Sequence, residues 1–158
     1  MSKLHNVRGR ITYISSHAKQ ENLYAVYETT DRHYWTELAR FNQQEFLKSG
    51  TDGKCIEARE LIIALPESFP DLYDPDRLLQ LFTNRFKEKY GVECVSALHH
   101  NKRKTNYHIH LIFSERELKN KLFHEALEKA YGNMADIKAE IKGRDNRPFN
   151  QPCFFPVR

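Results

Sequence analysis

Two short apolar segments joined by a polar connection most constrain how this chain can fold. Residues 92–98 and 107–113 are rich in β-branched, aromatic and other apolar side chains, and residues 99–106 between them are polar. This pattern favours two strands of an antiparallel hairpin. Because side chains two positions apart in a strand point to the same face, His108 and His110 should project together. The hairpin therefore predicts a pair of imidazoles on one face of a sheet.

A third histidine completes a candidate metal site. His100 lies where the hairpin would bring it alongside the pair, and His99 fits the same position. Neutral imidazoles suit divalent transition metals, and three of them leave coordination positions open, which is typical of a catalytic site. Because a lone His-x-His motif is weak, the alternative is that His108 and His110 are ordinary histidines on a sheet surface. We expect His100, His108 and His110 to be the ligands.

Helical and strand patterns elsewhere predict an α/β fold. We expect helices over residues 7–16, 34–48, 74–90 and 118–141, and further strands over residues 24–27 and 55–65. The chain of 158 residues is long enough for one domain with a real core. We therefore expect a central antiparallel sheet with helices packed mainly on one face, and the metal site open on the other.

A tyrosine near the start of the chain is a candidate nucleophile. Tyr13 lies on the first predicted helix, one turn after Arg10 and between isoleucines that should face the core. A tyrosine oxygen can attack phosphorus once a metal has activated the phosphate. Most of the eight tyrosines should be packing residues. Three others remain open as alternatives, namely Tyr24, Tyr27 and Tyr107.

Acidic and basic residues would complete such a site. Glu57 and Glu60 lie on the 55–65 strand, and their odd separation puts them on opposite faces, so at most one faces the histidines. Glu60 there could orient a ligand histidine or touch the metal; the alternative is an exposed charge paired with Arg59. The hairpin connection carries a basic run, whose members are Lys102, Arg103 and Lys104. This run could hold a phosphate backbone, or form a solvated hairpin tip.

Three stretches resemble one known family, the MobA/MobL-type relaxases, which belong to the HUH endonucleases that nick plasmid and transposon DNA. Residues 58–67 (ARELIIALPE) resemble the strand with the family's A-R-E and A-L-P-x-E motifs. Residues 100–113, with the segment NYHIHLIF, resemble its metal motif, and residues 6–14 (NVRGRITYI) resemble the opening of related relaxases. The resemblance covers roughly residues 3–116, and the histidine motif is its most specific part.

The resemblance implies a function and roles for individual residues. It implies strand-specific cleavage of single-stranded DNA at a plasmid or transposon transfer origin, through a 5′-phosphotyrosine intermediate. The three histidines would bind a divalent ion, Mg²⁺ or Mn²⁺, Tyr13 would attack and Glu60 would support the site. Arg10 and the basic run would contact DNA. Expected partners are the transfer-origin DNA, accessory mobilisation proteins and a coupling protein.

Two other functions stay open. The chain could be another HUH enzyme, a rolling-circle replication initiator or a transposase, or a non-catalytic DNA-binding accessory protein. The net charge of +4 permits a polyanionic partner without requiring one. We expect one nicking domain over residues 1–158, with residues after about 116 unassigned and compatible with a truncated C-terminal part.

The expected location is the bacterial cytoplasm. The three cysteines are far apart and form no C-x-x-C pair, which favours reduced thiols. The N-terminus lacks the apolar segment of a signal peptide, and no run approaches the roughly 20 apolar residues of a membrane span.

Overall fold

The computed structural model describes residues 1–16, 23–68, 74–101, 103, 105–117, 120–131 and 154–155. Its strands are β1 (Ser2–Leu4), β2 (Leu23–Glu28), β3 (Ala58–Leu65), β4 (Cys94–His100), β5 (Tyr107–Phe113) and β6 (Phe154–Phe155). Its helices are α1 (Val7–Ser15), α2 (Arg32–Ser49), α4 (Pro75–Tyr90) and α5 (Lys121–Tyr131). The elements alternate along the chain as expected for an α/β fold.

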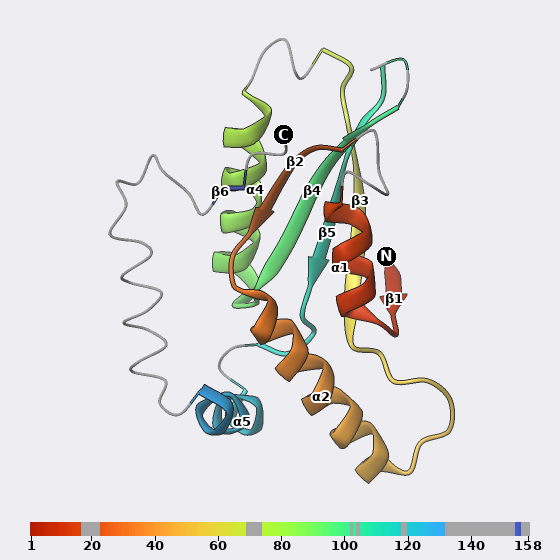
Figure 1. Cartoon of the computed structure of the whole chain (residues 1–158), viewed down its shortest axis with the longest axis vertical. Helices are drawn as coiled ribbons and strands as arrows, with labels where there is room; N and C mark the ends of the chain where they lie inside the picture. The colour runs from red at the N-terminus through yellow and green to blue at the C-terminus, as the bar shows by residue number, and fades with distance from the viewer. Residues whose placement is uncertain are drawn as a thin grey trace.

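The strands form one antiparallel sheet whose centre is the predicted hairpin (Figure 1). The strand order is β1-β3-β5-β4-β2-β6, and every described pair is antiparallel. Strands β4 and β5 pair over their whole length, from Cys94 opposite Phe113 to His100 opposite Tyr107. Strand β4 therefore ends, and β5 begins, at the connection that carries the basic run.

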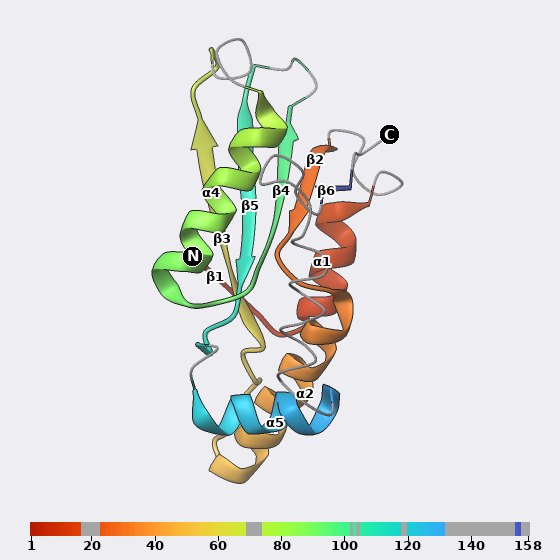
Figure 2. The same cartoon turned by 90° about the vertical axis from the view of Figure 1, so that its left-hand side faces the viewer.

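Helices cover both faces of this sheet, most of them on one side. In Figure 2, α4 and α1 lie on opposite sides of the strands. One core cluster joins α1, α2 and α5 to Val95, Ala97 and Ile112 of the central strands. The other joins α4 to the opposite side chains of the same strands. The α/β class, the antiparallel sheet and the concentration of helices on one side are confirmed.

Helix α1 begins at a well-defined cap. The side chain of Asn6 accepts a hydrogen bond from the amide of Gly9, and the amide of Val7 donates to the buried carboxylate of Glu57 at 2.9 Å. A Cβ at Gly9 would lie 2.7 Å from the Asn6 side chain, so glycine leaves room for the cap. Gly9 therefore helps to begin the helix, although glycine usually weakens helix interiors.

Most predicted elements are present with bounds shifted by a few residues, and one shift matters for function. The predicted strand 92–98 is displaced to Cys94–His100, so His99 and His100 belong to β4 and not to the connection. The predicted strand 55–65 begins at Ala58. Helix α5 ends, as far as it is described, at Tyr131, and the rest of the predicted helix 118–141 lies outside the described residues. Cys55 and Cys94 are buried free thiols, and Cys153 is outside the described residues.

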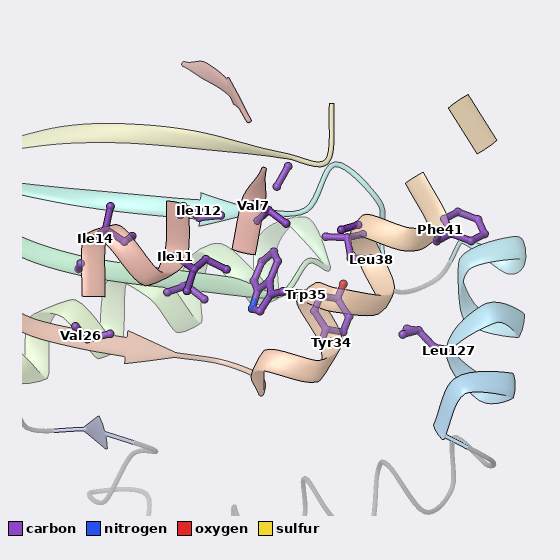
Figure 3. Close-up of a cluster of buried hydrophobic side chains, with 14 of the residues drawn as sticks. Val7, Ile11, Ile14, Val26, Tyr34, Trp35, Leu38, Phe41, Ile112 and Leu127 are labelled. Carbon is purple, nitrogen blue, oxygen red and sulfur yellow. The ribbon is translucent and has the colours of Figure 1, made fainter. Parts of the chain in front are cut away.

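The larger core cluster packs α1, α2 and α5 together against one face of the sheet. Figure 3 shows Ile11 and Ile14 of α1 beside Ile112, with Trp35 of α2 lying next to them. Trp35 and both isoleucines are completely buried. Leu127 of α5 extends the same cluster. Burying this apolar surface supplies most of the favourable free energy of folding at this face.

Ile112→Ala should lower the free energy of unfolding by about 2–5 kcal/mol, because it leaves a cavity in a packed core. The matched control is Ile62→Ala, which changes the same residue type on the same face of β3, where 59% of Ile62 is exposed. Its effect should stay within about 0.5 kcal/mol. Urea denaturation followed by the fluorescence of Trp35 measures both, and equal losses would contradict this description of the core.

Candidate metal centre

Three histidines on the two central strands gather on one face of the sheet. His99 of β4 lies opposite His108 of β5, and His110 follows two residues later on the same face. Each imidazole offers one nitrogen, and these three atoms lie within 4.8 Å of one another. The ring centroids of His99 and His110 are 4.5 Å apart, and those of His108 and His110 are 4.9 Å apart. Such a cluster could hold a metal ion.

His100, expected as the third member, lies elsewhere. It pairs with Tyr107 in the register of β4 and β5, and therefore points to the opposite face from its neighbour His99. Its ring meets the ring of Tyr24 edge-on and lies tilted against the ring of Tyr107, and its Nδ1 is 2.8 Å from the carbonyl of Asn101. The third member of the cluster is His99, the alternative left open by the sequence. The cause is the extension of β4 through both histidines.

The cluster also lies on the same face as α1. The expectation that the metal site is open on the face opposite most of the helices is therefore wrong. The ring Nε2 of His99 lies 2.9 Å from the backbone carbonyl of Ile14, which closes the end of α1 over the histidines. A carbonyl only accepts, so Nε2 carries the proton and Nδ1 keeps the lone pair that a metal needs. Helix α1 thus sets the tautomer of one member of the cluster.

Glu60 sets the orientation of a second member. Its Oε1 lies 2.6 Å from Nδ1 of His110, which leaves Nε2 of His110 as the nitrogen that could coordinate a metal. Glu60 is 2% exposed and also accepts hydrogen bonds from Arg10. Burial alone would raise the pKa of this carboxyl, but the hydrogen bonds from His110 and Arg10 outweigh it and hold the pKa at about 2. The alternative pairing with Arg59 does not occur, because Arg59 pairs with Glu115.

Tyr13 lies beside this network on α1. The carbon at the centre of the Arg10 guanidinium is 5.3 Å from the centre of the Tyr13 ring, and the same guanidinium binds Glu60. Tyr13 is 43% exposed, whereas Ile11 and Ile14 on the same helix are buried in the core. A continuous series of contacts therefore runs from Tyr13 through Arg10 and Glu60 to His110.

The three alternative tyrosines lie on the other face. Tyr27 donates its hydroxyl to Asn84 of α4, and its ring belongs to the core cluster of that face. Tyr107 belongs to the same cluster, and Tyr24 packs edge-on against Tyr107 and His100. Of the four candidate tyrosines, only Tyr13 shares a face with the histidine cluster.

The basic run can be placed only in part. Lys102 and Lys104 lie outside the described residues, and Arg103 is exposed in the connection after β4. The side-chain oxygen of Asn101 accepts hydrogen bonds from the amides of Thr105 and Asn106, which closes this connection. Since His99 and His108 are one residue pair away from the last pair of the hairpin, the connection adjoins the cluster.

Burial favours the neutral form of two histidines of the cluster, which is the form that can coordinate a metal. It lowers the pKa of His99 to about 4, against the hydrogen bond to Ile14 and with help from the neighbouring histidines. Burial, and then the proximity of His110, also lower the pKa of His108. Both rings are therefore neutral at pH 7. Three imidazoles, two of which have one nitrogen engaged and the other nitrogen free to coordinate, fit a divalent transition ion.

The lowered pKa of His99 predicts that the free energy of unfolding depends on pH. In EDTA, the folded state keeps this ring neutral down to about pH 4, whereas the unfolded chain binds a proton near pH 6.5. The free energy of unfolding should therefore be full above pH 6.5 and fall by up to about 3 kcal/mol as the pH drops to 4.

His99→Gln, whose amide can donate to the carbonyl of Ile14, should remove that part of the pH dependence. Denaturation curves of both proteins between pH 7.5 and 4 measure it. A variant with the full wild-type pH dependence would show that His99 does not cause the loss.

No described helix is both long and apolar enough to cross a membrane.

Comparison with known proteins identifies the family of this chain. Searches of curated proteins and of solved structures found no match. A family model described as the MobA/MobL family matches residues 28–151, which include Glu60 and all three clustered histidines but not α1. The match also extends beyond residue 116, where the resemblance seen in the sequence ended. The chain belongs to the MobA/MobL family.

Proposed function

We propose that this protein is a metal-dependent relaxase that nicks single-stranded DNA at a transfer origin and can reseal it. The observation that carries the proposal is the shared face of the sheet. The histidine cluster and Tyr13 lie on that face and are linked through Arg10 and Glu60. A phosphodiester held by the cluster would lie on the side of the sheet where the phenol is.

The histidines would hold the ion through Nδ1 of His99, Nε2 of His110 and a nitrogen of His108. A bound divalent ion supplies Lewis-acid stabilisation of the charge that develops on the phosphate oxygens. Mg²⁺ and Mn²⁺ are the candidates, and imidazole ligands favour Mn²⁺, since Mg²⁺ prefers oxygen ligands. The ionised Glu60 keeps His110 oriented and adds negative charge close to the ion.

In the chemical step the phenolic oxygen of Tyr13 forms a bond to the phosphorus of the scissile phosphodiester. The bond from phosphorus to the 3′-oxygen of the preceding nucleotide breaks, and that oxygen takes a proton and leaves as a free 3′-OH. The phenolic proton passes to solvent. The 5′ end stays attached as a phosphotyrosine. Because one phosphodiester bond replaces another, attack by a 3′-OH can reverse the step and reseal the strand.

DNA binding would use the connection beside the cluster. Arg103 is exposed there, and Lys102 and Lys104 are its neighbours in sequence. Their contacts to phosphates should weaken as the salt concentration rises. In a cytoplasmic setting the partners would be a transfer origin, accessory mobilisation proteins and a coupling protein. The whole chain would act as the nicking domain.

Measurements of Mn²⁺ affinity test whether His99 or His100 is the third metal ligand. His99→Ala should weaken Mn²⁺ binding at least about 10-fold, because it removes one of three ligands, and His100→Ala should leave it unchanged. The two variants are matched, since they alter adjacent residues of one strand. Titration calorimetry with Mn²⁺ at pH 7.5 measures the affinities. A loss in His100→Ala and not in His99→Ala would refute the proposed ligand set.

A nicking assay tests whether Tyr13 or another tyrosine is the nucleophile. The assay incubates the protein with Mn²⁺ and a panel of single-stranded oligonucleotides from transfer origins, replication origins and transposon ends. The transfer-origin oligonucleotides should give a covalent protein–DNA band on a denaturing gel. Tyr13→Phe should reduce this band by at least about 100-fold, because the nucleophile is lost, and Tyr24→Phe should leave it intact.

The outcomes of this assay distinguish the alternatives. A band that persists in Tyr13→Phe would assign another nucleophile. If every oligonucleotide binds without a covalent product, the chain is a non-catalytic DNA-binding protein. If only replication-origin or transposon-end sequences are cut, it is a replication initiator or a transposase.

A further inference from the structure

Arg10 makes contacts that a simple DNA-binding arginine would not need. Its Nε lies 2.8 Å from Oε2 of Glu60, and its Nη2 lies 2.9 Å from Oε1. This two-point contact uses the planar fork that distinguishes arginine from lysine. The Arg10 side chain is 31% exposed, while that of Glu60 is 3% exposed. The guanidinium therefore closes the buried carboxylate off from solvent.

The contact fixes more than the carboxylate. Oε1 of Glu60 accepts from both Arg10 and Nδ1 of His110. If the carboxylate rotated, the bond to His110 would be lost, and with it the constraint on the ring and its tautomer. Because Arg10 holds both oxygens, it prevents that rotation. The position of Arg10 on α1 thus decides how His110 on β5 presents Nε2.

The same guanidinium faces the ring of Tyr13. Arg10 and Tyr13 are three residues apart on α1, a spacing that brings side chains together on a helix. The separation of 5.3 Å from the ring centre is within the range of a cation–π contact. With 43% of the residue exposed, the Tyr13 ring would otherwise sample several rotamers. Arg10 limits where the phenol points.

We propose that Arg10 is a positioning residue that holds the nucleophile Tyr13 and, through Glu60, the metal ligand His110 in one rigid arrangement. This inference rests on the proposed nicking function. It explains how the nucleophile and the metal ligand are held in a fixed position relative to each other. It adds to the DNA contact expected for Arg10. Lysine should not replace it, because an ammonium group cannot bind both carboxylate oxygens in one plane.

The first test compares Arg10→Met and Arg10→Lys with Arg8→Met. Arg8 lies on the same helix and is exposed, so its loss changes the charge of α1 equally. Both Arg10 variants should bind Mn²⁺ about 10- to 100-fold more weakly than wild type, and Arg8→Met should not. Affinity for a single-stranded oligonucleotide, measured by fluorescence anisotropy, should fall equally in Arg10→Met and Arg8→Met.

A second readout needs neither metal nor DNA. In metal-free protein, ¹⁵N NMR of the histidine rings should show one tautomer for His110 in wild type and a mixture in both Arg10 variants. Circular dichroism verifies folding. If Arg10→Met does not fold, Arg10→Lys, which keeps a positive charge beside Glu60, decides the question.

A double-mutant cycle tests the route through Glu60. Glu60→Gln alone should weaken Mn²⁺ binding about 10- to 100-fold. Adding Arg10→Met to Glu60→Gln should then weaken it less than twofold further, because the carboxylate that Arg10 orients is gone. Two losses that multiply in full would show that Arg10 does not act through Glu60 and would overturn the proposal.

The remaining outcomes separate this inference from the proposed function. Unchanged Mn²⁺ affinity and an unchanged His110 tautomer in the Arg10 variants, with nicking intact in wild type, would overturn the positioning role alone. If Arg10→Met loses only DNA affinity and Arg10→Lys restores it in full, Arg10 is a plain phosphate contact and the positioning role is overturned. If wild type never forms a covalent product, nicking fails, while an effect of Arg10 on Mn²⁺ affinity would still support the link to His110. If wild type does not bind Mn²⁺, both fail.

Discussion

The register between β4 and β5 is the constraint on which the rest of this structure depends. Cα partners directly opposite each other share a face, so the pairing of His99 with His108 puts the whole cluster on one side. A slip of one residue in β4 would turn His99 away and bring His100 to the cluster's face. Packing on both faces of β4 resists such a slip. Val95 and Ala97 belong to the core cluster that packs with α1, and Cys94 and Leu98 belong to the cluster that packs with α4, so a slip would exchange them.

Helix α1 contacts the histidine cluster that this register assembles, and it also contacts Glu60. It packs through Ile11 and Ile14 into the core of the same face, and its last turn places the carbonyl of Ile14 on His99. The same helix carries Arg10 to Glu60. A carboxylate as buried as that of Glu60 is costly unless it is paired and hydrogen-bonded, and here three hydrogen bonds from two partners satisfy it. The arrangement therefore resists any shift of α1 relative to the sheet.

The family match begins after α1, so the membership and the proposed nucleophile rest on different observations. The match includes Glu60 and the clustered histidines. Tyr13 is connected to them only by the packing of α1 and by the contacts of Arg10. Its alternatives are on the opposite face, among the side chains that pack with α4. The proposal of Tyr13 as the nucleophile is therefore supported by geometry and not by the family match.

The sequence by itself determined that His108 and His110 share a face, since the two-residue period of a strand requires it. It also determined the main helices and the hairpin, because apolar periodicity and turn residues are local signals. The choice between His99 and His100 needed tertiary structure. The apolar pattern stops at Leu98, and only pairing with the neighbouring strands extends β4 through both histidines. The contacts of Glu60 with Arg10 and His110 join residues 50 positions apart in each direction. No local pattern encodes such contacts, and only packing of α1 on the folded sheet brings them about.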